Sequence, residues 1–249
     1  MSIRLKCGLL VFALASGSAQ ALSVDELVAK NAEARGGLDK IEAIKTIRFE
    51  GSLRFTGGFG TLDLTMLQVK KAPEMVRNEV SVQGLTQVQA WDGREAWQIS
   101  PFQGRKDPER MSEDDAKGIA DDASISGALI NYREKGSQIE YLGTEDVDGT
   151  EAHKLKVTLK NGDIETVYLD PDHFIEIRIV GQRKVRGTET EDVTDFGDYE
   201  RVAGVYFPFS IVSSTKGGGG QQQITIEKAE ANIDVEDSRF AFPAKSGGK

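Results

Sequence analysis

The sequence predicts a mainly β, α+β protein built on one curved antiparallel sheet. Through most of the chain apolar residues alternate with polar ones, which is the pattern of strands with one buried face. Short turns rich in glycine separate these segments, as is typical of antiparallel neighbours. Helical spacing occurs only near the start and in the middle of the chain. A sheet wrapped around two helical segments accounts for all three observations, and a closed barrel or a sandwich with peripheral helices remains the alternative.

The first 21 residues have the layout of a cleavable signal peptide. Arg4 and Lys6 supply positive charge, residues 9–15 form a short apolar run, and residues 19–21 read Ala-Gln-Ala, a cleavage site. The apolar run is shorter than the roughly 20 residues that span a bilayer. Cleavage would remove Cys7, the only cysteine. We therefore expect an exported protein that works outside the cytoplasm and has no disulfides.

The length of the mature chain allows one large β domain or two small ones; we expect a single domain over residues 22–243, followed by a flexible tail over residues 244–249. The whole chain has 31 Lys and Arg against 40 Asp and Glu; without the two basic residues of the signal peptide the net charge is −11. Such a charge disfavours nucleic acid and anionic lipid surfaces as partners. We expect no transmembrane segment in the mature chain, because no second apolar run approaches spanning length, and we expect a monomer.

Two short helices are predicted at the start of the mature chain. Ser23 and Glu26 have the spacing of a capping box, and Gly36 with Gly37 would end the first helix. Apolar residues then recur at helical spacing over residues 38–44, which predicts a second short helix.

From Thr46 the apolar period changes to two, and strands are predicted as far as Ile99. The alternation changes phase at Leu67, which indicates a bulge or a twist. From Asp107 to Lys135 the alternation is absent, and we expect one or two broken helices inserted between two runs of strands. Strands resume after residue 136, which gives about ten in all.

Side chains that commonly carry catalysis are few. The two histidines, His153 and His173, lie at strand starts beside turns, where an imidazole rarely has a catalytic or metal-binding role. No metalloprotease, thiol-redox, serine-hydrolase or nucleotide-binding motif occurs. Acidic pairs such as Asp121 and Asp122 are expected to form solvated faces. We therefore expect no catalytic residue, no metal, no cofactor and no enzyme activity.

Large apolar residues on the predicted inward faces can either line an adaptable pocket or pack as an ordinary core.

The chain resembles the LolA-like family, and more specifically the proteins described as outer-membrane lipoprotein-sorting proteins. The matching stretches run along nearly the whole mature chain: Lys30-Asn31 to Gly36-Gly37, Ile41 to Gly51, Trp91-Asp92-Gly93, Trp97 to Gly104, Leu129 to Tyr132, Lys135-Gly136, Tyr168-Leu169-Asp170, Asp198 to Val202, Gly204-Val205 with Pro208, and Phe240 to Pro243.

The resemblance implies a strongly curved antiparallel sheet that forms an unclosed β-barrel, with N-terminal and mid-chain helices plugging the concave face. It also implies a cavity for acyl chains of lipids or acylated proteins, and membrane-bound proteins that donate and accept this cargo. On the sheet the cavity residues would be Phe49, Leu53, Phe55, Leu62, Leu64, Met66, Met75, Trp97, Phe207 and Phe209. The lid helices would contribute Met111, Ile119, Leu129 and Ile130. For a cavity arginine of the family, Arg48, Arg54 and Arg77 remain alternatives.

The resemblance predicts a periplasmic carrier that shields acyl chains during transport toward the outer membrane. Two other functions remain open. One is a periplasmic sensor or interaction protein of the same fold. The other is a cell-envelope hydrolase, which would need an inward acid pair such as Asp63 with Glu79.

Overall fold

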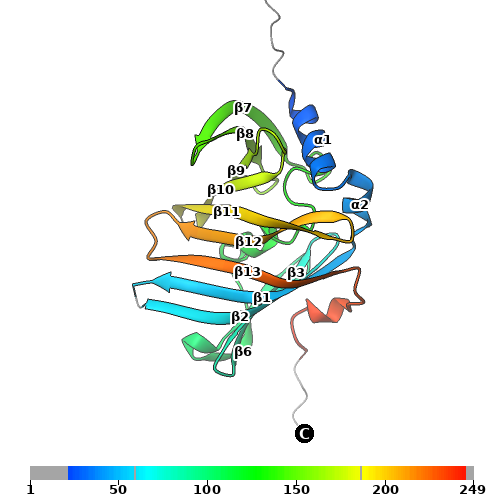
Figure 1. The fold of residues 1–249 in the computed structure, drawn as a ribbon. Helices are drawn as coiled ribbons and strands as arrows, with labels where there is room; N and C mark the ends of the chain where they lie inside the picture. Colours follow the sequence, from blue (N-terminus) through cyan, green and yellow to red (C-terminus); the bar gives the residue numbers. More distant parts are fainter. Residues whose placement is uncertain (1–21, 59, 186, 245–249) are drawn as a thin grey trace, which may run out of the picture.

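The computed structural model describes residues 22–58, 60–185 and 187–244, so the predicted signal peptide and most of the predicted tail lie outside the described residues. Thirteen antiparallel strands form one sheet in the order β6-β5-β4-β3-β2-β1-β13-β12-β11-β10-β9-β8-β7. The edge strands β6 and β7 do not pair with each other, so the sheet is an unclosed barrel (Figure 1). The strands are β1 (Thr46–Gly57), β2 (Gly60–Lys71), β3 (Met75–Val82), β4 (Leu85–Trp91), β5 (Ala96–Ser100), β6 (Arg105–Arg110), β7 (Gln138–Val147), β8 (Thr150–Thr158), β9 (Ile164–Leu169), β10 (Glu176–Val185), β11 (Thr188–Val202), β12 (Val205–Thr215) and β13 (Gly220–Ala231).

The helices are α1 (Val24–Ala34), α2 (Leu38–Ala43) and α3 (Glu113–Asp121), with short 3-10 turns at Pro101–Gln103 and Asp237–Arg239. The predicted capping box is confirmed, since the Glu26 amide donates to the Ser23 hydroxyl and the Ser23 amide donates to the Glu26 carboxylate. Figure 1 shows α1 and α2 together at one end of the strands.

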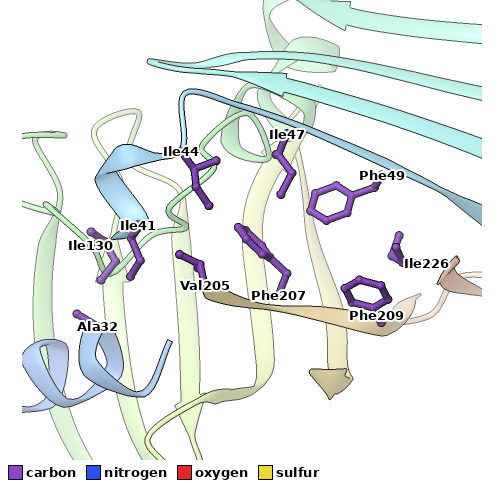
Figure 2. Packing of buried hydrophobic residues seen from close by; sticks show 10 residues of the cluster. All are labelled: Ala32, Ile41, Ile44, Ile47, Phe49, Ile130, Val205, Phe207, Phe209 and Ile226. Atoms are coloured by element: carbon purple, nitrogen blue, oxygen red, sulfur yellow. The ribbon is translucent and has the colours of Figure 1, made fainter. Parts of the chain in front are cut away.

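The N-terminal helices plug that end of the sheet through two apolar clusters. Leu27 of α1 packs with Leu129 and with residues of β8 and β9. Ile41 of α2 packs with β1 and β12, and Figure 2 shows the rings of Phe49 and Phe207 meeting in this cluster. These two rings lie edge to face with centroids 5.7 Å apart. Burial of such side chains holds the helices onto the concave face.

Residues 111–137, named here the crossing segment, connect β6 at one edge of the sheet to β7 at the other. Only α3 is helical in this segment; from Ser124 to Gly136 the chain forms bends and successive turns. Positive φ angles at Gly127, Asn131 and Gly136 break any regular helix there. One or two helices are predicted between the two runs of strands, and the structure has one there, α3.

Three sequence predictions need correction. The segment expected to turn helical at Asp107 begins as strand β6, which lies at the sheet edge, where Pro108 is tolerated and the side chains have no apolar face to bury. The sheet has thirteen strands in the described residues rather than about ten. No bulge occurs at Leu67, because the register of β1 with β2 is continuous; the irregularity lies in β1, between Glu50 and Gly51, in its pairing with β13.

The change of phase in β2 instead reflects apolar packing on both faces of the first half of the sheet. Residues 232–244 run over the convex face, and the Trp97 indole N–H donates to the Phe240 carbonyl at 2.7 Å. Trp97 packs there with Val88 and Ala90, and its ring meets that of Phe242 at 6.3 Å. Strands covered on both sides lose the simple alternation of one buried face.

Replacing Trp97 with alanine should destabilise the fold strongly, because it removes a buried indole and a buried hydrogen bond. We expect a loss of about 3–5 kcal/mol in the free energy of unfolding, measured by urea denaturation. Leu85→Ala is the matched control, since Leu85 is 42% exposed, and it should change stability by no more than about 0.5 kcal/mol. Equal effects of the two substitutions would contradict the outer core described here.

Candidate functional site

A cavity of about 1550 Å³ lies between the concave face of the sheet and the crossing segment. Strand register places Phe49, Met66 and Ile226 on this face, because side chains two residues apart along a strand point the same way. The apolar wall on the sheet, named here the floor, is formed by Phe49, Met66, Ile179, Phe196, Phe207, Ile211, Ile224 and Ile226. From the crossing segment, Met111, Ala116, Ile125 and Leu129 face the same space.

The structure brings five of the predicted site residues to the cavity wall: Phe49, Met66, Phe207, Met111 and Leu129. Three more are buried beside it. Phe209 and Ile130 belong to the cluster of Figure 2, and Ile119 packs α3 onto Val76 and Ala96.

The other predicted site residues are not among the described residues that line the cavity: Leu53, Phe55, Leu62, Leu64, Met75 and Trp97. Trp97 lies on the convex face, where it packs with Val88 and Ala90. Apolar residues occupy both faces of β5, so alternation could not show which face Trp97 takes. Register pairs Leu53 with Leu64 and Phe55 with Leu62 on the cavity side of the sheet, but toward the β1–β2 hairpin, where Leu62 is 45% exposed. Alternation identified the face correctly there but not where the cavity ends.

Arg35, which the sequence analysis missed, is the buried arginine of the cavity. It caps the C-terminus of α1, forms an ion pair with Glu176 at 3.6 Å, and donates from Nη1 to the Ser126 carbonyl at 2.7 Å. Its guanidinium lies 5.9 Å from the centroid of the Phe207 ring. Arg35 therefore connects α1, the crossing segment and the sheet at one point. The alternatives Arg48, Arg54 and Arg77 pair instead with acidic residues outside the cavity wall.

Lys135 holds the turns of the crossing segment in place from inside. Its ammonium donates to the hydroxyls of Ser124 and Ser126, at 2.9 and 2.8 Å, and to the Gly127 carbonyl at 2.6 Å. Burial lowers the pKa of Lys135 to about 8. The segment thus has a defined conformation although it is not helical.

The C-terminal end of α3 forms a clasp between two distant parts of the sheet. Asn161, in the β8–β9 hairpin, donates to Asp121 Oδ1 at 3.0 Å. The next residue, Asp122, accepts from Lys70 at 2.8 Å and from Gln68 at 3.0 Å, both on β2. Strand β2 and this hairpin are separated by several strands in the sheet, so Asp121 and Asp122 bridge the open side of the barrel. Asp122 is exposed, as predicted for a solvated face, whereas Asp121 is partly buried and both residues make specific hydrogen bonds.

The cavity also contains a carboxyl group, Glu165 of β9, that sequence reasoning did not single out. Burial and the nearby Asp121 raise the pKa of Glu165 to about 7. Burial likewise raises the pKa of Asp121 to about 6, although Arg183 opposes this shift. Perturbed carboxyl groups inside a cavity are common at functional sites.

Other residues with possible chemistry are engaged elsewhere. Asp63 pairs with Arg54, and Glu79 pairs with Arg77, so the acid pair suggested for a hydrolase is held by two different arginines. His153 accepts or donates a hydrogen bond with the Tyr141 hydroxyl at 2.9 Å. Within the described ranges there is no group of three or more His, Cys, Asp or Glu side chains that could hold a metal ion. No helix in those ranges is long and apolar enough to cross a membrane.

Glu165→Gln should flatten the pH dependence of stability. The folded chain holds a proton on Glu165 up to about pH 7, whereas the ordinary pKa is 4.5, so the stabilising contribution is complete at low pH and is lost as pH rises through 7. At pH 8 the variant should exceed the unmodified chain by roughly 1–3 kcal/mol in urea denaturation, and by less at pH 5. Glu140→Gln, on the exposed surface of β7, should reproduce the unmodified pH profile; a Glu165→Gln profile identical to it would contradict the burial of Glu165.

Comparison with known proteins identifies the fold through structure rather than sequence. No model of a known protein family matches the chain, and no curated protein matches it significantly in sequence. A LolA superfamily protein from Nitrosomonas europaea superposes with a TM-score of 0.62 at 14% identity, over 89% of this chain and 98% of that one. A DUF1329 family protein from Desulfovibrio piger gives 0.61 at 13% identity, over 88% and 97%.

A third solved structure, described as an outer membrane lipoprotein-sorting protein domain from Vibrio parahaemolyticus, gives a TM-score of 0.60 at 12% identity, over 88% of this chain and 97% of that one. Identities this low show the fold alone. The expected fold is confirmed: the chain is an unclosed antiparallel β-barrel of the LolA-like type, with helices against its concave face.

Proposed function

We propose that the mature protein is a periplasmic carrier that shields the acyl chains of a lipid or an acylated protein during transport toward the outer membrane. The observation that carries this proposal is the cavity of about 1550 Å³ between the apolar floor and the crossing segment. Pockets for drug-sized ligands are about 300–1,000 Å³, so this space suits a longer molecule. The signal-peptide pattern of residues 1–21 supports the location.

Transfer without a nucleotide requires cargo to move by differences in affinity. Each methylene group buried in the cavity contributes about 0.8 kcal/mol. Opening the crossing segment would expose Leu129 and break the clasp at Asp121 and Asp122, which offsets part of this gain. A bound state that is only moderately favoured can release its cargo to an acceptor protein at the membrane.

The polar bonds that hold the crossing segment fit such a role. The clasp, Arg35 and Lys135 attach the segment to the sheet by hydrogen bonds and ion pairs, which water can replace when the segment moves. Apolar contacts at Ile119 and Leu129 favour closure. The residues of the floor are proposed as the binding surface for acyl chains, and no catalytic step is required.

Met66→Glu should abolish binding of a fluorescent fatty-acid probe, because it places a carboxylate on the cavity floor, where an acyl chain cannot solvate it. We expect at least a tenfold loss in affinity, on the order of 1.4 kcal/mol or more, with unchanged β-sheet circular dichroism. Leu142→Glu is the matched control: Leu142 lies on β7 and is 45% exposed. Probe binding that survives Met66→Glu would remove the floor from the proposed site.

Native mass spectrometry of the protein purified from its own periplasm tests the function directly. A co-purifying lipid or acylated peptide would support the carrier and identify its cargo. A lipid-free mass together with a stable protein partner would instead favour the sensor function and contradict the proposal.

A further inference from the structure

One wall of the cavity, formed by β9, β10 and α3, is charged rather than apolar. Glu165 of β9 pairs across the ladder with Gly181 of β10, and Arg183 lies two residues further along the same face. Glu165 and Arg183 are therefore diagonal neighbours with no side chain between them. Both line the cavity. In the part of the chain that the structure describes, the Glu165 carboxylate has no hydrogen-bond or ion-pair partner.

Two glycines keep space around the Arg183 guanidinium. A Cβ at Gly118, in the middle of α3, would collide with Nη1, and a Cβ at Gly181 would lie 3.3 Å from Nη2. Glycine is unfavourable inside helices and strands, so its presence at both positions preserves this arrangement. The ion pair that Arg183 makes in the described residues joins Nε to Asp192 at 3.7 Å, which leaves both Nη groups able to donate to a ligand.

This charged wall adjoins the apolar floor. Ile179 precedes Gly181 on the same face of β10, and Phe196, Ile211 and Ile224 continue the floor across β11, β12 and β13. A molecule with a charged head at β9–β10 could extend its acyl chains over the floor without leaving the cavity. The two surfaces together fit an amphiphile rather than a bare hydrocarbon.

We propose that the charged wall binds the head of a zwitterionic phospholipid, with its ammonium group at Glu165 and its phosphate at Arg183. The proposal rests on the carrier function above and names its ligand class. A purely anionic head would satisfy Arg183 but would leave Glu165 without a partner. A zwitterionic head supplies hydrogen-bond donors to the carboxylate and acceptors to the guanidinium at once.

The electrostatics around Glu165 agree with a cationic partner. The charged groups that face it are Arg183 from β10, Asp121 and Asp122 at the end of α3, and Lys135 of the crossing segment. Burial, Asp121 and Asp122 raise the pKa of Glu165 to about 7, whereas Arg183 and Lys135 oppose this shift, and a bound ammonium group would favour the ionised form. Affinity for an ammonium head should therefore rise as pH increases from 6 to 8.

The test uses the delipidated mature chain and two fluorescent phospholipids with identical acyl chains. One is phosphatidylethanolamine; the other is its N-acetylated form, which keeps the phosphate but lacks the ammonium charge. At pH 8 we expect the amine form to bind about tenfold more tightly, and at pH 6 about threefold or less, because Glu165 is then mostly protonated.

Substitutions then separate the two charged partners. Glu165→Gln, which resembles the protonated side chain in shape, should reduce the preference for the amine form to about onefold at both pH values. Arg183→Gln should weaken both lipids by about tenfold, whereas Glu165→Gln should weaken only the amine form. Glu140→Gln has the same change of charge on the exposed surface of β7 and should behave as the unmodified chain. Circular dichroism and thermal unfolding establish that each variant is folded.

Equal affinity for the two lipids at pH 8 would overturn the proposal while leaving the carrier function intact. A preference for the amine form that persists in folded Glu165→Gln would also overturn it, since the ammonium group would then lie elsewhere. Binding of neither lipid, nor of the fatty-acid probe, would instead reject the carrier function itself.

Discussion

The arrangement of the molecule depends on one topological constraint: the connection between β6 and β7 must run from one edge of the sheet to the other. Neighbouring strands are consecutive in each half of the sheet, and β1 pairs with β13 at the seam, so β6 and β7 lie at opposite edges. The chain makes this crossing over the concave face, where α3 and the turns of residues 124–136 pack against the strands. A sheet that would otherwise expose its apolar face is thereby covered by its own connection.

A cavity persists under this connection because the contacts that hold it are polar as well as apolar. Arg35, Lys135 and the acidic clasp fix the crossing segment at defined points along the sheet. Apolar contact alone would be non-directional and would favour collapse onto the floor. Hydrogen bonds set a distance as well as an attraction, so they keep the two surfaces apart over the space between them. The same polar groups carry a desolvation cost, which appears as the raised pKa of Asp121 and the lowered pKa of Lys135.

Local pattern predicted most of the fold and a smaller part of the candidate site. Period-two alternation located the strands and the inward face of Phe49, Met66 and Phe207, because the side-chain direction in a strand is a local property. It failed at β6, an edge strand with no apolar face, and at Trp97, whose strand is covered on both sides. The charged residues of the cavity could not be predicted, since Asp121 meets Asn161 only after distant segments have folded together, and the position of Glu165 beside Arg183 depends on the register between β9 and β10. Gly118 and Gly181 were the available signals, but a glycine shows that space is needed and not which side chain needs it.

The seam between β1 and β13 has a consequence for how the protein acquires its structure. Ile47, at the start of the first strand, pairs with Ala231, at the end of the last strand, so the centre of the sheet joins residues from nearly opposite ends of the chain. Pairings of such long sequence separation make folding slow relative to that of helical bundles. The central seam cannot form until the last strand is present, which leaves the chain incompletely folded through synthesis. A translocation system that accepts only unfolded polypeptides would therefore meet the chain in a suitable state.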